Sequence, residues 1–282
     1  MNIKAYAKIN LGLHIVGTRP DGFHNIETIF HRVGLHDEIT LHAHNTIVLQ
    51  SSHPDLPLDE KNLCWQAVEL LRAETGISAG AAITITKHIP LGAGLGGGSS
   101  NAAAVLINLP ALWNIQVNND VLRKIALQLG SDVPFFLGRM SAFAEGRGEI
   151  LSYFPLRIPF WIVVVTPPIH VSTSWAYRAL SDSRNGEFPD RPRFQYNSET
   201  AVVNNITSFR NDFEEVVLNR YPEIGKAKKL LDAQGAVFSL LSGSGASVFG
   251  LFDSREKAER LTNEAGSRYF THITEPNFTV SE

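Results

Sequence analysis

Residues 90–104 read Pro-Leu-Gly-Ala-Gly-Leu-Gly-Gly-Gly-Ser-Ser-Asn-Ala-Ala-Ala, with five glycines in the seven residues 92–98. An alternating apolar run at 82–86 precedes this stretch and an alanine-rich run follows it, so we predict a loop that joins a strand to a helix. Glycine lets backbone N–H groups converge on a ligand, and the next helix N-terminus adds donors and partial positive charge. The stretch therefore predicts a binding loop for an anion such as phosphate.

Two familiar phosphate loops fit this stretch poorly. Gly92-x-Gly94-x-x-Gly97 satisfies the dinucleotide fingerprint of a Rossmann unit, but the acidic position about 20 residues further on is Asp120, at a predicted helix start. A P-loop requires a lysine where Gly98 stands. A cation that neutralises phosphate must therefore come from another segment.

Polar residues follow the glycines directly. Ser99, Ser100 and Asn101 are good N-cap residues, and their side chains could instead contact phosphate or a magnesium ion. Helix capping alone would also explain them. From Ala102 to Leu109 the sequence predicts a helix, which Pro110 should end or kink.

Length and composition limit the possible functions. With 282 residues we expect one large or two moderate domains, and a formal net charge of −3 gives no reason to expect nucleic acid or an anionic membrane as partner. The single cysteine, Cys64, excludes an internal disulfide and fits a reducing compartment. The N-terminus lacks the features of a secretory signal and the apolar run 160–165 is too short to span a bilayer, so we expect a cytoplasmic protein.

The N-terminal part predicts strands. Residues 5–16 alternate, which places Lys8 and Asn10 on one face, where both could reach one site. A lysine in a strand is more often a solvated edge residue. Residues 38–50 predict a hairpin, and residues 62–75 a helix that ends at Gly76.

An aromatic residue next to a histidine follows the first strand. The turn at 19–22 delivers Phe23 and His24 to the start of the next apolar segment. Such a pair can grip a flat base. The simpler interpretation is a core phenylalanine and a histidine with a local hydrogen bond.

Acidic residues near the middle of the chain allow two interpretations each. We predict a helix over 121–129, capped by Asp120. Asp132 follows the helix stop that Gly130 predicts and stands among apolar residues, so burial would demand a partner, although a turn or cap aspartate is the alternative. Glu145 and Arg147 follow a predicted strand and would form a surface ion pair.

The second half changes character near residue 156, where we place a domain boundary. A continuous apolar strand covers 161–165, and residues 181–200 are polar and aperiodic, which makes them a lid candidate. Residues 242–245, Ser-Gly-Ser-Gly, form a second glycine turn between two predicted strands. It could abut the first glycine loop or simply close a hairpin.

The glycine loop resembles the phosphate loop of the GHMP kinases, small-molecule kinases named for galactose, homoserine, mevalonate and phosphomevalonate. Further segments extend the resemblance, in the right order, over nearly the full length, and they point within this family to a kinase of an alcohol that carries a cytidine diphosphate group. These segments are residues 7–11, 19–24, 130–134 and 242–246.

The resemblance implies an α+β fold of two domains. Residues 1–155 would form an N-terminal ATP-binding domain that is ribosomal protein S5 domain 2-like. Residues 156–282 would form a C-terminal GHMP kinase domain, a ferredoxin-like α/β sandwich. A monomer and a homodimer both fit.

The resemblance also implies site residues. ATP would donate the phosphate, with Mg²⁺ as cofactor, Asp132 would be the general base, and Lys8 the cation beside it. The residues implied for ATP binding are Pro90, Leu91, Gly92, Ala93, Gly94, Leu95, Gly96, Gly97, Gly98, Ser99 and Ser100. Those implied for substrate binding are Asn10, Phe23, His24 and Tyr177, and the metal ligands, by superfamily analogy alone, are Ser100 and Glu145.

In the implied substrate site, Phe23 and Tyr177 would cover the two faces of cytosine while His24 bonds its edge. Phe23 stands where this family generally has tyrosine, so stacking survives but a contact through a phenolic oxygen is lost. The alternatives are a GHMP kinase for another alcohol, of the homoserine or mevalonate type, a non-catalytic nucleotide-binding module and, last, a Rossmann oxidoreductase.

Overall fold

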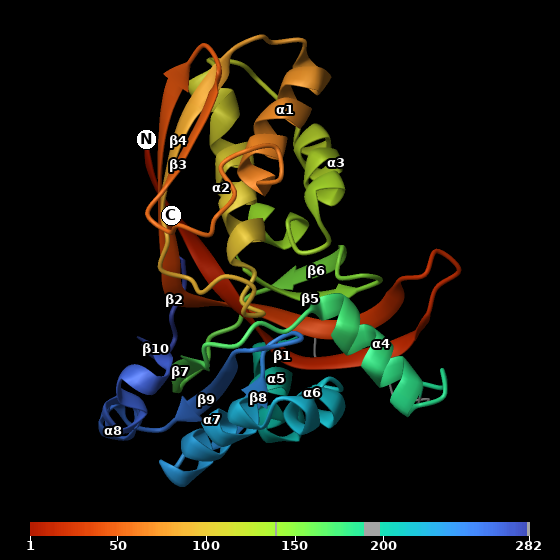
Figure 1. Ribbon diagram of the computed structural model, residues 1–282, viewed down its shortest axis with the longest axis vertical. Helices are drawn as coiled ribbons and strands as arrows, with labels where there is room; N and C mark the ends of the chain where they lie inside the picture. Colours follow the sequence, from red (N-terminus) through yellow and green to blue (C-terminus); the bar gives the residue numbers. More distant parts are fainter. Residues whose placement is uncertain (139, 189–197, 281–282) are drawn as a thin grey trace. The chain divides into compact units, whose positions relative to one another are not determined.

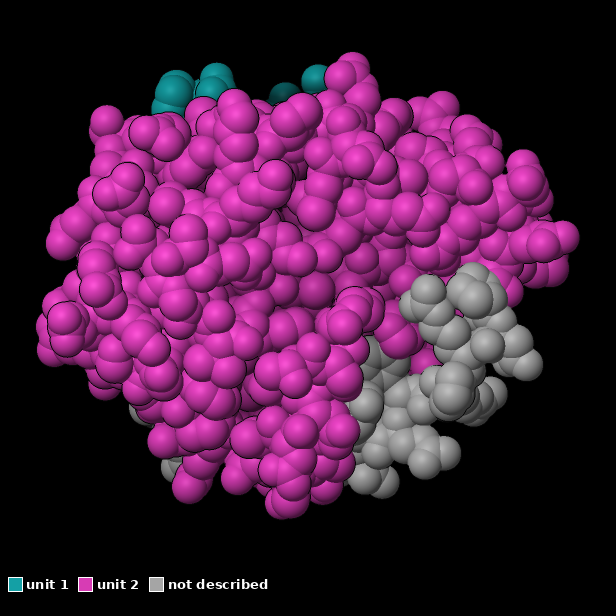
Figure 2. Space-filling view, turned by 90° about the horizontal axis from the view of Figure 1, so that it is seen from below, with its two compact units in different colours: residues 1–7, 36–91, 96–139 teal, residues 8–35, 92–95, 140–282 magenta. Residues whose placement is uncertain are grey.

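The structure is a computed structural model, and it describes residues 1–138, 140–188 and 198–280 (Figure 1). It contains two compact units, coloured separately in Figure 2: residues 1–7, 36–91 and 96–139 form unit 1, and residues 8–35, 92–95 and 140–282 form unit 2. Strands β1 (Asn2–Thr18) and β2 (His24–His44) have residues in both units. The family domains 1–155 and 156–282 stay a prediction.

Strand β4 (Gly80–Thr86) is the central strand of the sheet in unit 1. It pairs antiparallel with residues 38–44 of β2 and parallel with β3 (Ile47–Ser51). The hairpin predicted over 38–50 is therefore wrong, because β4 lies between its two arms. A parallel pair needs a crossover, and the helix between β3 and β4 supplies it.

That crossover is α1 (Leu63–Thr75), which the sequence predicted closely. Asn62 caps it, accepting a hydrogen bond from Cys64 N at 2.9 Å, and Gly76 ends it in the left-handed conformation, with φ 72°. Cys64 is buried, and burial raises the pKa of its thiol to about 12, so it is a packed and unreactive thiol.

Two further helices, α2 (Gly97–Leu112) and α3 (Asn119–Leu129), pack with α1 beside β3 and β4 in Figure 1. Helix α2 begins directly at the glycines with Gly96 as its N-cap, so the prediction that residues 99–101 cap it is wrong. It continues two residues beyond Pro110. Asn118, rather than Asp120, caps α3.

A second sheet lies in unit 2, in the order β10-β7-β9-β8, with all neighbours antiparallel. Its strands are β7 (Trp161–Thr166), β8 (Phe238–Leu241), β9 (Val248–Phe252) and β10 (Phe270–Thr274). Helices α7 (Pro222–Ala233) and α8 (Arg255–Ala265) pack against it. The two sheets with their helices agree with the predicted α+β class.

Shorter elements complete the chain. In unit 2, residues 28–30 of β2 pair with β5 (Ser141–Glu145), which pairs with β6 (Ile150–Phe154). The remaining helices are α4 (Thr173–Ser183), α5 (Glu199–Asn204) and α6 (Glu214–Arg220), with 3₁₀ turns at Pro134–Leu137, Ile206–Ser208 and Gly266–Arg268. Residues 189–197 of the lid predicted over 181–200 lie outside the described residues.

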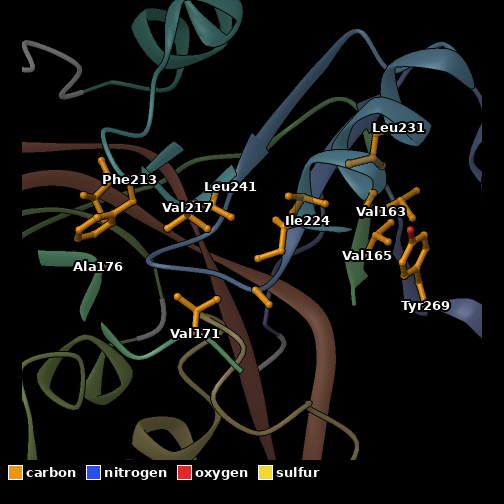
Figure 3. Packing of buried hydrophobic residues seen from close by; sticks show 14 of the residues in the cluster. Val163, Val165, Val171, Ala176, Phe213, Val217, Ile224, Leu231, Leu241 and Tyr269 are labelled. Atoms are coloured by element: carbon orange, nitrogen blue, oxygen red, sulfur yellow. The ribbon is translucent and has the colours of Figure 1, made fainter. Parts of the chain in front are cut away.

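The core of unit 2 joins β1 to the second sheet. Figure 3 shows side chains of this core, including Val163 of β7, Leu241 of β8 and Phe213, and the same core contains Leu13 and Ile15 of β1. The strand that carries Lys8 and Asn10 is thereby fixed to the rest of unit 2. None of the helices in the described ranges is long and apolar enough to cross a membrane.

A buried histidine makes the stability of the fold sensitive to acid. His31 in β2 is fully buried with Nδ1 2.8 Å from Ser141 Oγ, and burial lowers its pKa to about 4. Between pH 6.5 and 4 the unfolded chain takes up a proton that the folded protein excludes, so this contribution is complete above pH 6.5 and is lost as the pH falls. It amounts to roughly 3 kcal/mol.

We predict that His31→Gln reduces the loss in free energy of unfolding between pH 7 and pH 4.5, measured by urea denaturation at each pH. His42→Gln is the control, because His42 is exposed and should leave the pH dependence unchanged. An unaltered pH dependence in His31→Gln would show that another group causes the acid sensitivity.

Candidate functional site

The two glycine turns touch in unit 2, as the sequence analysis allowed. The backbone of Gly94 approaches the second turn so closely that a Cβ atom on it would lie 2.2 Å from Ser242 O and 3.0 Å from Gly245 O. Ser242 Oγ donates a hydrogen bond to Gly94 O at 3.0 Å, and Ser247 N donates one to Ala93 O at 3.1 Å. The second turn also closes the β8–β9 hairpin, so both interpretations of it are correct.

Lys8 and Asn10 of β1 lie at the same place. Their side chains share one face of the strand, and Lys8 Nζ donates to Asn10 Oδ1 at 2.6 Å. Lys8 N donates to Leu95 O at 2.9 Å, and a Cβ on Gly243 would lie 3.5 Å from Asn10 Oδ1. Unit 2 thus brings the lysine, the asparagine and both glycine turns together.

Burial decides between the two interpretations of Lys8. The residue is 3% exposed and Asn10 is 1% exposed, so the solvated edge interpretation is wrong. The ammonium lies 4.8 Å from the centre of the Phe30 ring, within the range of a cation–π contact. Asn10 Nδ2 in turn donates to Thr28 Oγ1 at 3.0 Å, which fixes the side chain that accepts from Lys8.

The remaining part of the glycine loop belongs to unit 1. Gly96 caps α2 in the left-handed conformation, φ 69°, and offers no side-chain acceptor to the first turn of the helix. The first backbone N–H groups of a helix have no partner within the helix, and they form a ready site for an anion. The start of α2 therefore fits the phosphate loop that the sequence predicted.

Asp37 ties the two ends of this loop within unit 1. Its fully buried carboxylate accepts from His88 N at 2.7 Å and Ile89 N at 2.8 Å, just before the loop, and from Asn101 Nδ2 at 2.9 Å, just after it. It also forms an ion pair with Lys87. Asp37 could not be predicted from the sequence, because no local pattern links a residue of β2 to residues 87–101.

Asp132 lies in unit 1, between the end of α3 and the following 3₁₀ turn, and it is half-buried. The turn it occupies follows Gly130, as predicted, and Val133 N donates to Gly130 O at 3.2 Å. Its assignment as general base stays a prediction from the resemblance.

His24 and Tyr177 form a stacked pair in unit 2. Their ring centres lie 4.7 Å apart at an interplanar angle of 20°, and the edge of the Phe213 ring supports Tyr177 at 4.9 Å. His24 Nε2 is buried and has no hydrogen-bond partner among the described residues. Partial burial lowers the pKa of His24, which favours the neutral ring. An unsatisfied nitrogen beside stacked rings fits a flat ligand with a polar edge.

Phe23 is not a core residue. It is 51% exposed, and the guanidinium carbon of Arg147 lies 4.6 Å from its ring centre. Arg147 pairs with Glu149 at 3.8 Å instead of with Glu145, which corrects the predicted surface pair. Phe23 thus lies against a guanidinium, whereas Tyr177 lies against the ring of His24.

The predicted metal ligands, Ser100 and Glu145, do not belong to a cluster of acidic, histidine or cysteine side chains in the described residues. Across residues 1–138, 140–188 and 198–280, no three or more His, Cys, Asp or Glu side chains are arranged to hold a metal ion. Ser100 is buried in the first turn of α2, and Glu145 is half-buried at the end of β5. Their role as ligands stays a prediction.

Comparison with known families and structures places this arrangement in the GHMP kinases. The family model of the GHMP kinase N-terminal domain matches residues 62–139, and that of the C-terminal domain matches residues 199–271. The chain belongs to this class of small-molecule kinases, whose phosphate donor is ATP. Its two-domain fold is the GHMP kinase fold.

Full-length relatives narrow the class. The 4-diphosphocytidyl-2-C-methyl-D-erythritol kinase of Prosthecochloris aestuarii is 42% identical over 100% of this chain and 99% of its own. A crystal structure of 4-(cytidine 5'-diphospho)-2C-methyl-D-erythritol kinase superposes with a TM-score of 0.83, at 32% identity, over 99% of this chain and 100% of the other. The chain belongs to the 4-diphosphocytidyl-2-C-methyl-D-erythritol kinase family.

A more distant structure shows the fold alone. Homoserine kinase from Cytophaga hutchinsonii superposes with a TM-score of 0.70 at 20% identity, over 98% of this chain and 95% of that one. A likeness at this identity says nothing about the substrate. The Rossmann oxidoreductase interpretation is excluded by the family.

We predict that Gly94→Ala weakens ATP binding at least tenfold, measured by calorimetry with a non-hydrolysable ATP analogue. A Cβ there would collide with the carbonyl of Ser242, and φ at residue 94 is +77°, where an L side chain is strained. Gly225→Ala is the matched control, because Gly225 lies within α7 and a Cβ on it meets nothing within 4 Å. Equal ATP affinity in the two variants would contradict a role of the glycine contact.

Proposed function

We propose that this protein transfers the γ-phosphate of ATP to the 2-hydroxyl of 4-diphosphocytidyl-2-C-methyl-D-erythritol, giving the 2-phosphate and ADP. The reaction belongs to the non-mevalonate, or methylerythritol phosphate, route to isoprenoid precursors. The observation that carries the proposal is the buried Lys8–Asn10 pair against both glycine turns. A charge at a glycine-rich phosphate loop suits phosphoryl transfer, which depends on positioning and charge neutralisation.

ATP binding is assigned to residues 90–100. The glycines leave backbone N–H groups accessible to phosphate oxygens, and the uncapped first turn of α2 adds further donors. The loop contains no lysine of its own. Lys8, whose backbone bonds Leu95 of the loop, supplies a cation from another segment, as the sequence analysis required.

The proposed chemistry needs one residue to remove a proton and another to stabilise negative charge. Asp132 takes the proton of the attacking hydroxyl as general base, and Lys8 stabilises the oxyanion that forms on that hydroxyl. Asn10, held by Lys8 and Thr28, orients the substrate. A fixed asparagine suits this role because its amide offers both a donor and an acceptor.

The cytosine base is assigned to Phe23, His24 and Tyr177. The exposed Phe23 ring and the ring of Tyr177 offer faces for stacking, and buried His24 Nε2 offers a hydrogen bond to the base edge. Stacking on aromatic rings contributes about 1–3 kcal/mol per base. The phenylalanine at position 23 retains this energy without a phenolic oxygen.

A magnesium ion is the proposed cofactor, with Ser100 and Glu145 as its protein ligands. Two protein ligands would suffice for this ion, because Mg²⁺ commonly keeps several waters and binds through one or two carboxylates and substrate phosphates. When bound, Mg²⁺ neutralises charge on the phosphates. We further propose a cytoplasmic protein that acts as a monomer or homodimer, without nucleic acid or membrane as partner.

We predict that Asp132→Asn and Lys8→Ala each lower kcat by roughly 100-fold or more, and that the melting temperature changes little in the isosteric variant Asp132→Asn. The measurement is a coupled ADP-release assay with ATP and the cytidylylated methylerythritol, with homoserine and mevalonate as competing acceptors. Asp120→Asn and Lys4→Ala are matched controls, because both residues are exposed. Near-normal turnover in Asp132→Asn, or a preference for homoserine or mevalonate, would overturn the proposal.

We predict that Phe23→Ala and Tyr177→Ala each weaken the binding of cytidine diphosphate roughly 5- to 100-fold, measured by calorimetry, because each removes a stacking face. Phe270→Ala is the control, since Phe270 is a partly exposed aromatic on β10. Cytidine diphosphate affinity that survives both substitutions would favour a GHMP kinase for a different alcohol.

A further inference from the structure

Asn211 has a buried side chain, 4% exposed, whose amide group makes three hydrogen bonds in unit 2. Its Nδ2 donates to Leu241 O and to Gly243 O, both at 2.8 Å, and its Oδ1 accepts from Phe213 N at 2.9 Å. The only amide orientation that satisfies all three bonds is this one. The side chain therefore fixes the second glycine turn through the carbonyl groups of Leu241 and Gly243.

The turn that Asn211 holds contacts the first glycine loop directly. Ser242 lies between the two carbonyls that Asn211 binds, and its hydroxyl donates to Gly94 O at 3.0 Å. Gly243, whose carbonyl Asn211 binds, also lies against the Lys8–Asn10 pair, since a Cβ on it would be 3.5 Å from Asn10 Oδ1. A shift of this turn would therefore disturb its contacts both with Gly94 of the phosphate loop and with the Lys8–Asn10 pair.

The backbone of Asn211 is fixed to the same strand that carries Lys8 and Asn10. Residue 211 forms a parallel bridge with Leu13 of β1, in which Leu13 N donates to Arg210 O at 2.8 Å and Asp212 N donates to Leu13 O at 2.9 Å. The side chain of Asn211 thus spans from β1 to the second glycine turn. Its distance to both is set by hydrogen bonds.

The third bond of Asn211 reaches the other end of the substrate site. Phe213, whose N–H Asn211 accepts, packs edge-on against Tyr177 with ring centres 4.9 Å apart, and Tyr177 stacks on His24. The two N–H groups of the amide therefore hold the glycine turn beside the proposed phosphate loop. Its oxygen holds the backbone of Phe213, whose ring supports Tyr177 at the proposed base site. A substitution can separate these two functions.

We infer that Asn211 is a positioning residue for phosphoryl transfer: it sets the second glycine turn against the phosphate loop and the Lys8–Asn10 pair. The inference rests on the proposed kinase function. Asn211 does not touch the reacting atoms, and it acts through the carbonyls of Leu241 and Gly243.

The test is Asn211→Asp, which keeps the acceptor for Phe213 N but presents oxygen to the two carbonyls. Even a protonated carboxyl has one O–H where the amide has two N–H groups. We expect kcat/KM for ATP to fall at least tenfold and the affinity for a non-hydrolysable ATP analogue to fall, while Kd for cytidine monophosphate stays within twofold. A merely structural role would change the melting temperature, but it would not weaken the binding of the ATP analogue while leaving the binding of cytidine monophosphate unchanged.

Ser239→Ala is the matched control, because Ser239 is buried in the same sheet and its hydroxyl bonds Asp232 at 2.6 Å, on α7. It should lower stability and leave both affinities unchanged. Asn211→Ser, which is too short to reach both carbonyls, provides the same comparison if the buried carboxyl prevents folding. An unchanged ATP affinity in a folded Asn211 variant overturns the inference.

The wild-type protein in the same assays separates the two proposals. A wild type that binds the ATP analogue but phosphorylates no cytidylylated alcohol would contradict the proposed function. The ATP affinity of Asn211→Asp would still decide the positioning role in that case.

Discussion

The contact between the two glycine turns of unit 2 leaves no room for a side chain, and the candidate site depends on it. A Cβ on Gly94 would lie 2.2 Å from Ser242 O, so only glycine allows the two backbones to meet. Ser242 and Ser247 then bond the carbonyls of Gly94 and Ala93, and Leu95 accepts from Lys8 N. The direction of the loop is therefore fixed by backbone bonds to two distant segments.

Lys8 shows why that fixed position matters. Burying an ammonium costs several kcal/mol unless polar partners surround it, and a protein gains stability more simply from an apolar residue in such a place. Lys8 is nevertheless 3% exposed, with Asn10 Oδ1 at 2.6 Å and the Phe30 ring at 4.8 Å. A buried cation beside a glycine loop that has no lysine fits the role in charge neutralisation that we propose for Lys8.

The sequence predicted those features that depend on local chemistry. Asn62 and Gly76 mark the ends of α1 because capping involves residues within a turn of the helix. The glycine loop and the second glycine turn were found for the same reason. Their contact was left open, since nothing in either stretch encodes the other.

The features that were missed depend on partners far apart in the chain. The hairpin over 38–50 failed because β4, from residues 80–86, pairs with both of its arms. Alternation placed Lys8 and Asn10 on one face but could not show that this face is buried. The functional roles came from the resemblance to a family, since residue types alone allowed a cap for Asp132 and a core position for Phe23.

A loop rich in glycine is flexible by itself, so residues outside the loop must fix its conformation. Each glycine costs roughly 0.5–1 kcal/mol in lost conformational freedom, so the five in residues 92–98 cost about 3–5 kcal/mol when the loop is ordered. Hydrogen bonds to a charged group contribute about 1.5–3 kcal/mol each, and neutral ones about 1. The bonds to Asp37 in unit 1 and those of Asn211 in unit 2 hold segments that flank or contact the loop. Both side chains are buried and lie outside residues 92–98, so they help to order this loop without bonding its own backbone N–H groups.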